Sequence, residues 1–563
     1  MDEAHRAAHT IARGDRGTRT VDRPGSGPWK LMLRLPPEPR VTSVDRECLT
    51  FPDGSIDCVV LQGECGAMDG SRDAGEQTTS GVVGTLKSLV PLRSFRAQRK
   101  ARVRLLAEIR RMLKPDGQIV ILVGNRYDHG YLRGRRDPCS GLRFTSLLPR
   151  LIANAYSILA TGKTYRACTH SLGDYHRLLR DAGYTSLEIC GLTPDFIRPT
   201  ELIPFGVRGQ TWRVAPSRGL HRIRRNRHFV PAYAIIASNT APARASIAEE
   251  IARGIEGALH ANPDSSTFSA FRITGKNKGI VSGEIGDRSI IVKVAFDEAA
   301  ESGNRRNYQF LERAQQIPEL RDLVPRPVAT GSVRGVRYYA ETAVRGTLLD
   351  AVLNADNASS YLTGISAALR AINPHLPERP PQPFAGDAFR RQVLSPLDRI
   401  AQTTGRHSLI ENVRALFRSH LENKPLRLGL VHGDFCGSNI TVVGFTVTGI
   451  IDWEDTRDGG IAALDALNYV EALHRIWGRR GVTTVEILSG LDEWGSLASA
   501  EQQFLEEHYL RCGMDPMCHF ALTYLYWIRH VADQLDGGLG NDPQALEERV
   551  VRPLEQFVAR AHA

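Results

Sequence analysis

Residues 430–440 read Leu-Val-His-Gly-Asp-Phe-Cys-Gly-Ser-Asn-Ile, and residues 450–454 read Ile-Ile-Asp-Trp-Glu. Asn439 follows Asp434 by five positions, and Asp452 ends an apolar run thirteen positions after Asn439. Phosphoryl transfer needs a group that orients the acceptor hydroxyl, and metal ligands that bridge the terminal phosphates and neutralise their charge. Magnesium favours such hard oxygen donors and fills its remaining positions with water and phosphate. The two segments therefore predict a phosphotransfer site that uses ATP and Mg2+.

These segments resemble the catalytic loop and the metal-binding segment of the aminoglycoside phosphotransferase and choline kinase superfamily, whose members are relatives of the protein kinases. The resemblance implies that Asp434 is the catalytic base. It implies that Asn439 and Asp452 are magnesium ligands, with Asp452 the main one. His432 is grouped with the nucleotide-binding residues, although we expect it to brace the loop rather than to transfer protons.

Two further residues are expected to shape this site. Gly433 stands where the chain needs a tight turn, and glycine permits backbone conformations that other residues avoid. Asp465 lies a dozen residues past the metal-binding segment, and the resemblance implies that it helps to hold the lobe.

A candidate nucleotide lysine lies upstream, in the apolar run Ser289–Val294. In the kinase pattern such a strand lysine, here Lys293, contacts the α- and β-phosphates and pairs with a helix glutamate. The helix expected after it offers Glu301 and Glu312, while Asn307 stands where the family usually places the glutamate. We take Glu301 as the predicted partner of Lys293.

Two other segments bear on nucleotide binding. Gly275–Gly279 carries two glycines and two lysines and fits either a phosphate-covering loop or a plain hairpin. Tyr339–Ala343, with Glu341 at its centre, resembles the inter-lobe hinge, where backbone groups would contact adenine.

The acceptor is expected to be a small-molecule hydroxyl. A sugar, an aminoglycoside-like compound and an amino alcohol all remain open. Members of the superfamily with cationic acceptors gather carboxylates and aromatic rings in the helical lobe. Residues of these types are present, although helix packing explains them equally well: Asp458, Glu471, Asp533, Trp453, Tyr524 and Trp527.

The chain of 563 residues is too long for one hydrophobic core, so several domains are expected. Residues 1–40 are expected to be irregular. Residues 41–238 are expected to form an α/β domain, 239–246 a linker, and 247–563 a two-lobed, protein-kinase-like domain. Within that domain the small lobe spans about 268–341 and the helical lobe about 345–563.

The first half alternates apolar strand-like runs with helical ones, which favours a mostly parallel α/β sheet. The predicted strands are Val41–Val44, Cys58–Leu61, Gln118–Val123, Ser186–Cys190 and Ala232–Ala237, and the predicted helices are Ala101–Leu113 and Leu172–Ala182. Lys114-Pro115-Asp116-Gly117 is expected to stop the first helix.

Residues 50–60, 106–117 and 174–184 resemble segments of class I S-adenosylmethionine methyltransferases, which implies a Rossmann-like sheet. Cofactor capture in such a sheet needs a glycine-rich turn after the first strand and an acidic residue after the second. Gly25-Ser26-Gly27 has no apolar strand before it. Asp45, twenty positions after Gly25, can be interpreted as the ribose acid, but its short distance from residues 51–57 fits the later, adenine-side loop. We therefore expect an incomplete methyltransferase-like sheet, with S-adenosylmethionine binding doubtful.

Composition sets the remaining expectations. The net charge of +10 comes partly from arginine clusters that lack interleaved aromatics, which are interpreted as solvated helix faces rather than a nucleic-acid site. No apolar run is long enough for a membrane span, and nine scattered cysteines fit reduced thiols in a cytoplasm. The oligomeric state is left open. The alternatives to a kinase are a methyltransferase with an accessory kinase-like domain and a non-catalytic nucleotide-binding scaffold.

Overall fold

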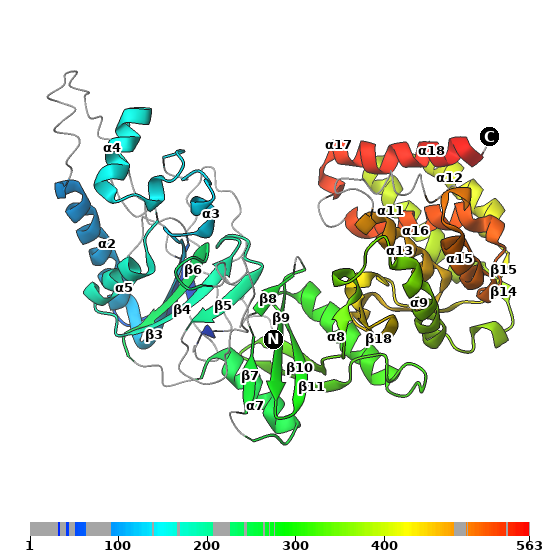
Figure 1. Cartoon of the computed structure of the whole chain (residues 1–563), viewed down its shortest axis with the longest axis horizontal. Helices are drawn as coiled ribbons and strands as arrows, with labels where there is room; N and C mark the ends of the chain where they lie inside the picture. Colours follow the sequence, from blue (N-terminus) through cyan, green and yellow to red (C-terminus); the bar gives the residue numbers. More distant parts are fainter. Residues whose placement is uncertain are drawn as a thin grey trace. The chain divides into compact units, whose positions relative to one another are not determined.

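The computed structural model of the chain forms two compact units (Figure 1). Unit 1 comprises Met1–Ser302 and Val328–Thr342, and unit 2 comprises Gly303–Pro327 and Ala343–Ala563. The structure describes residues 32–33, 41–43, 51–62, 92–137, 140–165, 169–205, 226–240, 245–262, 265–269, 271–274, 276–477, 491, 494–535 and 539–561. The predicted cofactor residues Gly25, Gly27 and Asp45 lie outside the described residues.

Unit 1 is built on a single 12-stranded sheet with the strand order β1-β2-β3-β6-β4-β5-β8-β9-β10-β12-β11, and β7 pairs with β9. The strands are β1 (Val41–Ser43), β2 (Ile56–Gln62), β3 (Leu113–Gly124), β4 (Ser186–Thr193), β5 (Glu201–Phe205), β6 (Ala232–Ser238), β7 (Ser266–Phe268), β8 (Phe271–Ile273), β9 (Lys278–Ile285), β10 (Arg288–Ala295), β11 (Pro327–Val333) and β12 (Val336–Thr342).

The first half of this sheet is mixed, so the expectation of a mostly parallel sheet is corrected. Strands β1, β2 and β3 pair in parallel. Strand β6 then lies antiparallel between β3 and β4, and β5 adds to β4 in the antiparallel sense. Each predicted strand is present. The prediction missed β5 and the direction of β6 because strand direction depends on distant chain connections.

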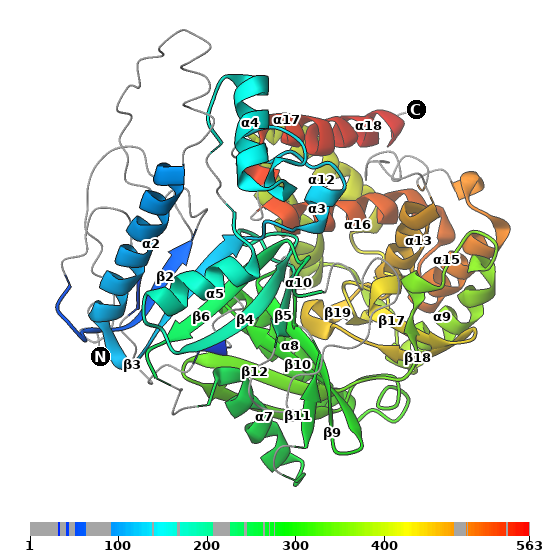
Figure 2. The same ribbon diagram turned by 60° about the vertical axis from the view of Figure 1, so that its left-hand side comes forward.

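Two helices cover one face of this half. They are α2 (Leu92–Met112) and α5 (Leu172–Asp181), seen beside the strands in Figure 2. Leu106, Ile109 and Leu178 pack against alternate strand residues such as Val59 and Ile121. The alternation arises because successive side chains in a strand point to opposite faces. Helix α5 begins with a capping box between Ser171 and Asp174.

The opposite face of the sheet packs in a second apolar cluster, which contains residues from both sides of the predicted linker. Val60 and Leu122 on this face pack in the same cluster as Ile251 of α7 (Ile247–Ala258) and Val292 of β10. Ser246, the last residue of the predicted linker, is the N-cap of α7. The compact unit therefore joins the α/β part to the strand-rich part, while the division into two functional domains stays a prediction.

The sheet itself also crosses from one part to the other. Strand β5 pairs with β8 through Glu201 opposite Arg272 and Leu202 opposite Phe271. Leu202 and Phe271 are both fully buried in the shared cluster. A strand of the α/β part thus covers the edge of the strand-rich part, an edge that would otherwise be open to pairing with another chain.

Unit 2 is mainly helical. Its helices include α9 (Ala358–Ile372), α10 (Gly386–Phe389), α11 (Ser395–Thr404), α12 (His407–Leu421), α13 (Ala463–Trp477), α15 (Ser499–Arg511), α16 (His519–Gln534), α17 (Pro543–Leu546) and α18 (Arg552–Ala561). Short strands carry the loops of interest: β13 (Thr347–Leu348), β14 (Gln382–Pro383), β15 (Pro425–Leu426), β16 (Gly429–Val431), β17 (Ile440–Val443), β18 (Thr446–Ile450) and β19 (Arg457–Gly460). Helix α8 (Glu298–Ala314) crosses the boundary between the units.

The strand-rich stretch and the following helical stretch are both present, as the sequence predicts. The core of unit 2 includes several large buried aromatic rings, among them Trp453, Trp527, Tyr524 and Phe557. Among the described residues, no helix is both long enough and apolar enough to span a membrane.

Candidate functional site

The catalytic-loop segment leaves β16 through a turn that only glycine can make. Gly433 has φ +90°, and a Cβ at this position would lie 2.5 Å from the backbone oxygen of Asp455. Asp465, in the first turn of α13, accepts hydrogen bonds from the backbone N–H groups of His432 (2.7 Å) and Gly433 (3.0 Å). Burial raises the pKa of the Asp465 carboxyl. The predicted structural roles of Gly433 and Asp465 are confirmed.

His432 links the catalytic loop to the segment that carries Asp452. Its ring is fully buried, and Nε2 donates to the backbone oxygen of Ile451 over 3.0 Å. Nδ1 accepts from the backbone N–H of Asp434 over 3.2 Å. Because both ring nitrogens are engaged inside the loop, the ring braces it. This arrangement agrees with the expected bracing role, while the grouping of His432 with nucleotide-binding residues stays a prediction.

Asn439 orients Asp434. Its side-chain Nδ2 donates to the backbone oxygen and to Oδ2 of Asp434, both over 2.9 Å. Its backbone oxygen accepts from the N–H of Ile451, the residue before Asp452, over 2.9 Å. One residue thus fixes the carboxylate of Asp434 and bonds the backbone next to Asp452, whereas its role as a magnesium ligand stays a prediction.

Asp452 follows β18 in the left-handed region of the backbone, with φ +65° and ψ 60°. A residue other than glycine in this region stores strain that surrounding contacts must offset, and such residues cluster at functional sites. The backbone N–H of the next residue, Trp453, donates to Oδ1 of Asn307 over 2.9 Å. Its indole donates to the backbone oxygen of Ile450 over 2.9 Å.

Three residues of α8, at positions 306, 307 and 310, hold this segment. Besides Asn307, Arg306 donates from Nε to the backbone oxygen of Glu454 over 3.0 Å. Phe310 stacks on Trp453 with ring centroids 4.3 Å apart. We refer to Arg306, Asn307 and Phe310 as the α8 clamp. The sequence marked Asn307 only as a departure from the family, because a contact between residues 146 positions apart has no local signal.

Lys293 has a different partner from the one predicted. Its Nζ lies 2.9 Å from Oε1 of Glu341, and both side chains are buried. Lys293 pairs in register with Tyr339, so Glu341, two residues along β12, is its diagonal neighbour on the same face. Oε1 of Glu301 instead lies 3.7 Å from Nε of Arg337. The prediction that Glu301 pairs with Lys293 was therefore wrong.

Glu341 was predicted as part of the hinge rather than as this partner. Its side chain is engaged with Lys293. Backbone contact between Tyr339–Ala343 and adenine stays a prediction. The candidate phosphate loop lies between β8 and β9, where Thr274 accepts from Asn277 over 3.2 Å and Asn277 has φ +53°. Gly275 in this loop lies outside the described residues.

Most of the residues suggested for a cationic acceptor are engaged in packing or in ion pairs. Trp453, Tyr524 and Trp527 are buried in the core of unit 2. Asp458 pairs with Arg313 over 2.9 Å, and Asp533 with Arg457 over 3.2 Å. Helix packing and surface ion pairs account for these five residues.

Glu471 belongs to a polar cluster that the sequence did not indicate. On α13 it accepts from Nε of Arg475 over 3.1 Å, and it lies 3.4 Å from the hydroxyl of Tyr526 on α16. The same hydroxyl donates to Asn468 over 3.0 Å. Burial raises the pKa of the Tyr526 phenol, and the charges of Glu471 and Asp434 add to this effect. The cluster therefore lies within electrostatic reach of the proposed base.

The donor set suits magnesium better than a transition metal. Asn439 can offer Oδ1 because its Nδ2 is used on Asp434, and Asp452 offers a carboxylate. Among the described residues, no group of three or more His, Cys, Asp or Glu side chains is gathered to hold a metal. A small number of oxygen ligands completed by phosphate and water is typical of Mg2+ in phosphotransferases.

Comparison with known protein families finds a match to the part of the chain that carries these residues. The phosphotransferase enzyme family matches residues 277–478, which include Lys293, Asp434, Asn439 and Asp452. Residues 41–238 lie outside that match. No curated protein matches the chain.

Solved aminoglycoside phosphotransferases share a weak similarity with the chain. APH(4)-Ia is 15% identical, with 55% of this chain and 98% of that chain covered at a TM-score of 0.37. The gentamicin complex of APH(2'')-IIa is 14% identical, with 55% and 95% covered and a TM-score of 0.35. ADP-bound APH(2'')-Ib is 13% identical, with 55% and 96% covered and a TM-score of 0.34. Similarity of this degree does not define a reaction.

Proposed function

We propose that the second half of this protein transfers the γ-phosphoryl group of ATP to a hydroxyl of a small molecule. The observation that carries the proposal is the arrangement around Asn439. Its amide holds the carboxylate of Asp434, and its backbone is bonded to the residue before Asp452. The family match over residues 277–478 supports the same reaction class.

Each residue then has a defined task. Asp434 accepts the proton of the acceptor hydroxyl as its oxygen bonds to the γ-phosphorus and the bond from phosphorus to the β-γ bridging oxygen breaks, releasing ADP. Asn439 and Asp452 would hold Mg2+, which neutralises charge on the phosphates when bound. Lys293, oriented by Glu341, is proposed to contact the α- and β-phosphates.

The acceptor is proposed to be a hydroxylated, sugar-like molecule rather than a polycation. The cluster near Asp434 contains hydroxyl, amide and carboxylate groups, which suit hydrogen bonding to hydroxyls. The charge of Glu471 is matched by Arg475 within the cluster, so a cationic acceptor gains less there than it would from an isolated carboxylate.

A metabolite screen for ATP- and Mg2+-dependent phosphorylation tests the reaction, with Asp452→Ala as the blank. Once an acceptor is found, Asp434→Asn should lower kcat by about 10²–10⁴-fold, the usual contribution of a general base. Asp458→Asn is the matched control, because this carboxylate is exposed and forms a surface ion pair with Arg313. Such an exposed ion pair contributes less than ~1 kcal/mol to stability. Unchanged turnover in Asp434→Asn would contradict the assignment.

S-adenosylmethionine binding by the first half stays a prediction of the sequence. Calorimetry of the full chain with S-adenosylmethionine tests it. No heat at millimolar ligand excludes the methyltransferase alternative.

A further inference from the structure

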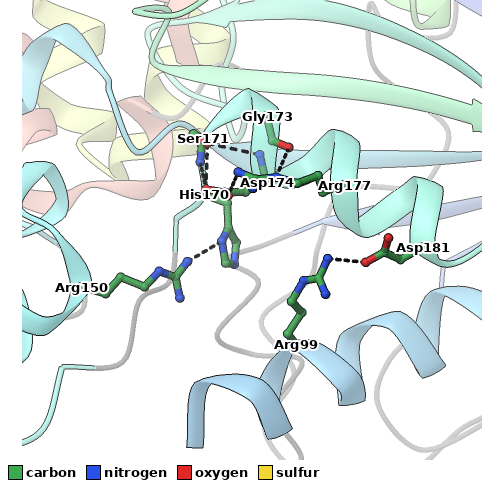
Figure 3. A network of polar contacts seen from close by, with 8 residues as sticks. All are labelled: Arg99, Arg150, His170, Ser171, Gly173, Asp174, Arg177 and Asp181. Atoms are coloured by element: carbon green, nitrogen blue, oxygen red, sulfur yellow. Dashed lines mark hydrogen bonds and ion pairs between the residues drawn. The ribbon is translucent and has the colours of Figure 1, made fainter. Parts of the chain in front are cut away.

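Arginines from three separate elements surround His170 in unit 1. Arg102 lies on α2, Arg126 follows the end of β3, and Arg150 is the first residue of α4 (Arg150–Thr161). Nη1 of Arg102 lies 2.6 Å from Nε2 of His170. Nη2 of Arg150 lies 2.7 Å from Nδ1 of the same ring (Figure 3). Arg102, which the sequence suggested would be solvated, is 3% exposed.

A neutral imidazole accepts a hydrogen bond at only one of its two nitrogens, because the other carries a hydrogen. Burial, then the charges of Arg102 and Arg150, lowers the pKa of His170 to about 3, so the ring is neutral at physiological pH. Arginine is only a donor. One of the two guanidinium groups therefore faces an N–H, an arrangement that a nearby anion would relieve.

The third arginine, Arg126, is fixed by hydrogen bonds to backbone oxygens. Arg126 donates from Nε to the backbone oxygen of Ser146 over 2.6 Å and also bonds the backbone oxygen of Leu148. This contact fixes its charge beside the start of α4. Burial and the charge of Arg126 lower the pKa of Arg150 below its usual range. The positive groups thus repel one another in their folded positions.

Buried hydroxyls accompany the arginines. Thr145 and Ser146 are the first residues of the short helix η3 (Thr145–Leu147), and Thr169 precedes His170. Each is less than 5% exposed. In the described structure the hydroxyl oxygens of all three lack a hydrogen-bond partner. A buried hydroxyl without a partner is costly, and such groups call for an explanation such as a missing ligand.

The acidic neighbour of the cluster is already engaged. The charge of Asp174 favours protonation of Arg150 and His170. Its Oδ2 accepts from the hydroxyl of Ser171 over 2.7 Å, and its Oδ1 from Arg177 over 2.9 Å (Figure 3). Its carboxylate is therefore committed to the capping box of α5.

The position in the sheet also suits a ligand. Arg126 comes two residues after β3 ends, and Asn125 forms a parallel bridge with His170. Open sheets with parallel strands bind ligands outside the carboxyl ends of those strands. Helix α4, 12 residues long, has no side-chain cap at its N-terminus and no acidic residue in its first turn, so its N–H groups add to the positive field.

We propose that Arg102, Arg126 and Arg150, with the hydroxyls of Thr145, Ser146 and Thr169, form a binding site for a phosphate dianion or phosphate monoester. Guanidinium groups and hydroxyls supplied by several elements can donate to the three terminal oxygens of phosphate. A planar carboxylate offers fewer acceptors to so many donors. All six residues belong to unit 1, whereas Asp434, Asn439 and Asp452 belong to unit 2.

Calorimetric titration of the full chain with inorganic phosphate, at constant ionic strength, tests the site. Binding should be saturable in the wild type and at least about tenfold weaker in Arg150→Gln, which removes a charged donor. Arg99→Gln is the matched control. Arg99 lies on α2, as Arg102 does, is exposed, and pairs with Asp181, so the phosphate binding of the variant should equal that of the wild type (Figure 3).

Thr145→Val provides a second test if Arg150→Gln does not fold. It keeps the side-chain volume and removes a buried hydroxyl that lacks a partner. Without phosphate its Tm should equal or exceed that of the wild type, whereas its phosphate affinity should fall. A structural role for the hydroxyl predicts the opposite change in Tm.

Three outcomes overturn the proposal. One is the absence of saturable phosphate binding at millimolar concentrations. Another is binding that persists in both Arg150→Gln and Thr145→Val but disappears in Asp452→Ala, which would place the phosphate in the kinase-like half. The third is tighter binding of malonate than of phosphate, with the same dependence on Arg150, which would identify a dicarboxylate site instead.

Discussion

Gly433 shows how one residue sets the shape of the catalytic loop. Its φ of +90° alone disfavours any side chain, and a Cβ would also meet the backbone oxygen of Asp455 at 2.5 Å. Backbone oxygen cannot swing away as the end of a flexible side chain can. The turn therefore excludes alanine for two independent reasons.

Gly433→Ala should lower the free energy of unfolding by about 1–3 kcal/mol, the range for strained backbone positions. Gly444→Ala is the matched control, since Gly444 also has positive φ (+60°) but nothing lies within 4 Å of its Cβ position. Urea denaturation of both variants separates the backbone strain from the clash. Equal losses in the two variants would show that the contact with Asp455 contributes nothing.

His519 makes the stability of unit 2 depend on pH. Burial lowers its pKa to about 4, while an unfolded histidine titrates near 6.5. The unfolded chain therefore binds more protons below pH 6.5, and the free energy of unfolding falls as pH decreases from about 6.5 towards 4. For this residue alone the loss between pH 7 and pH 5 is about 2 kcal/mol.

His519→Gln should remove that part of the pH dependence, because glutamine does not titrate. Denaturant unfolding at pH 7 and pH 5 measures it, and the difference between the two pH values should shrink in the variant. His508, whose pKa burial also lowers to about 4, remains in both proteins and supplies a residual dependence. An unchanged difference would show that His519 has the same pKa in the folded and unfolded chain.

Helix α8 is the element that positions the segment after Asp452. The helix of the kinase pattern contributes a glutamate to the strand lysine, whereas here Glu341 from β12 pairs with Lys293. The α8 clamp instead bonds the backbone on both sides of Trp453, directly after the strained Asp452. Helix α8 therefore does not supply this glutamate partner of Lys293, and instead bonds the backbone that follows Asp452.

Asn307→Ala should raise the Mg2+ concentration needed for half-maximal activity by about 10–100-fold, as loss of a ligand-orienting partner usually does. It also leaves the buried N–H of Trp453 without its acceptor, at a cost of about 1–3 kcal/mol in stability. Asn307→Asp keeps an acceptor oxygen and should restore most activity. Gln309→Ala, on the exposed face of α8, is the control.

An unaltered Mg2+ dependence in Asn307→Ala, together with the expected loss of stability, would mean that the clamp is purely structural. The activity measurement relies on the acceptor found by the metabolite screen.

At the scale of the whole chain, the two halves of unit 1 share one sheet and one apolar cluster. Leu202 of β5 and Phe271 of β8 are buried together, and Ile247, Ile251 and Ile255 of α7 fill the same cluster. Arg334, in the hairpin between β11 and β12, bonds the backbone oxygen of Ala245 over 2.9 Å and pairs with Glu250 of α7.

The predicted kinase-like fragment 247–563 should therefore be unstable by itself. Each buried aliphatic side chain that loses its cover costs about 1.5–3 kcal/mol, and several in the shared cluster would be exposed at once. The fragment should be recovered mainly in the insoluble fraction, or with a lower Tm than the full chain. Differential scanning calorimetry of both proteins compares them. Equal Tm values would show that the sequence boundary is also a folding boundary.

Much of the local structure was predictable, because it follows from short-range patterns. The strands around Cys58 and Ile119 and the helix around Ile109 follow from alternation and helical spacing. The loop positions Gly433, Asn439 and Asp452 follow from one motif and its spacing. The strand β5 and the antiparallel direction of β6 did not follow, since both depend on which distant strands become neighbours.

The sequence by itself determined the candidate chemistry, because Asp434, Asn439 and Asp452 lie within nineteen positions and two short strands bring them together. Only the tertiary structure decided the partners of those residues. Glu341 meets Lys293 through strand register, Asn307 reaches Trp453 across the fold, and Arg102 and Arg150 meet at His170 from separate helices. Contacts between residues far apart in the chain leave no local pattern, because they arise from packing.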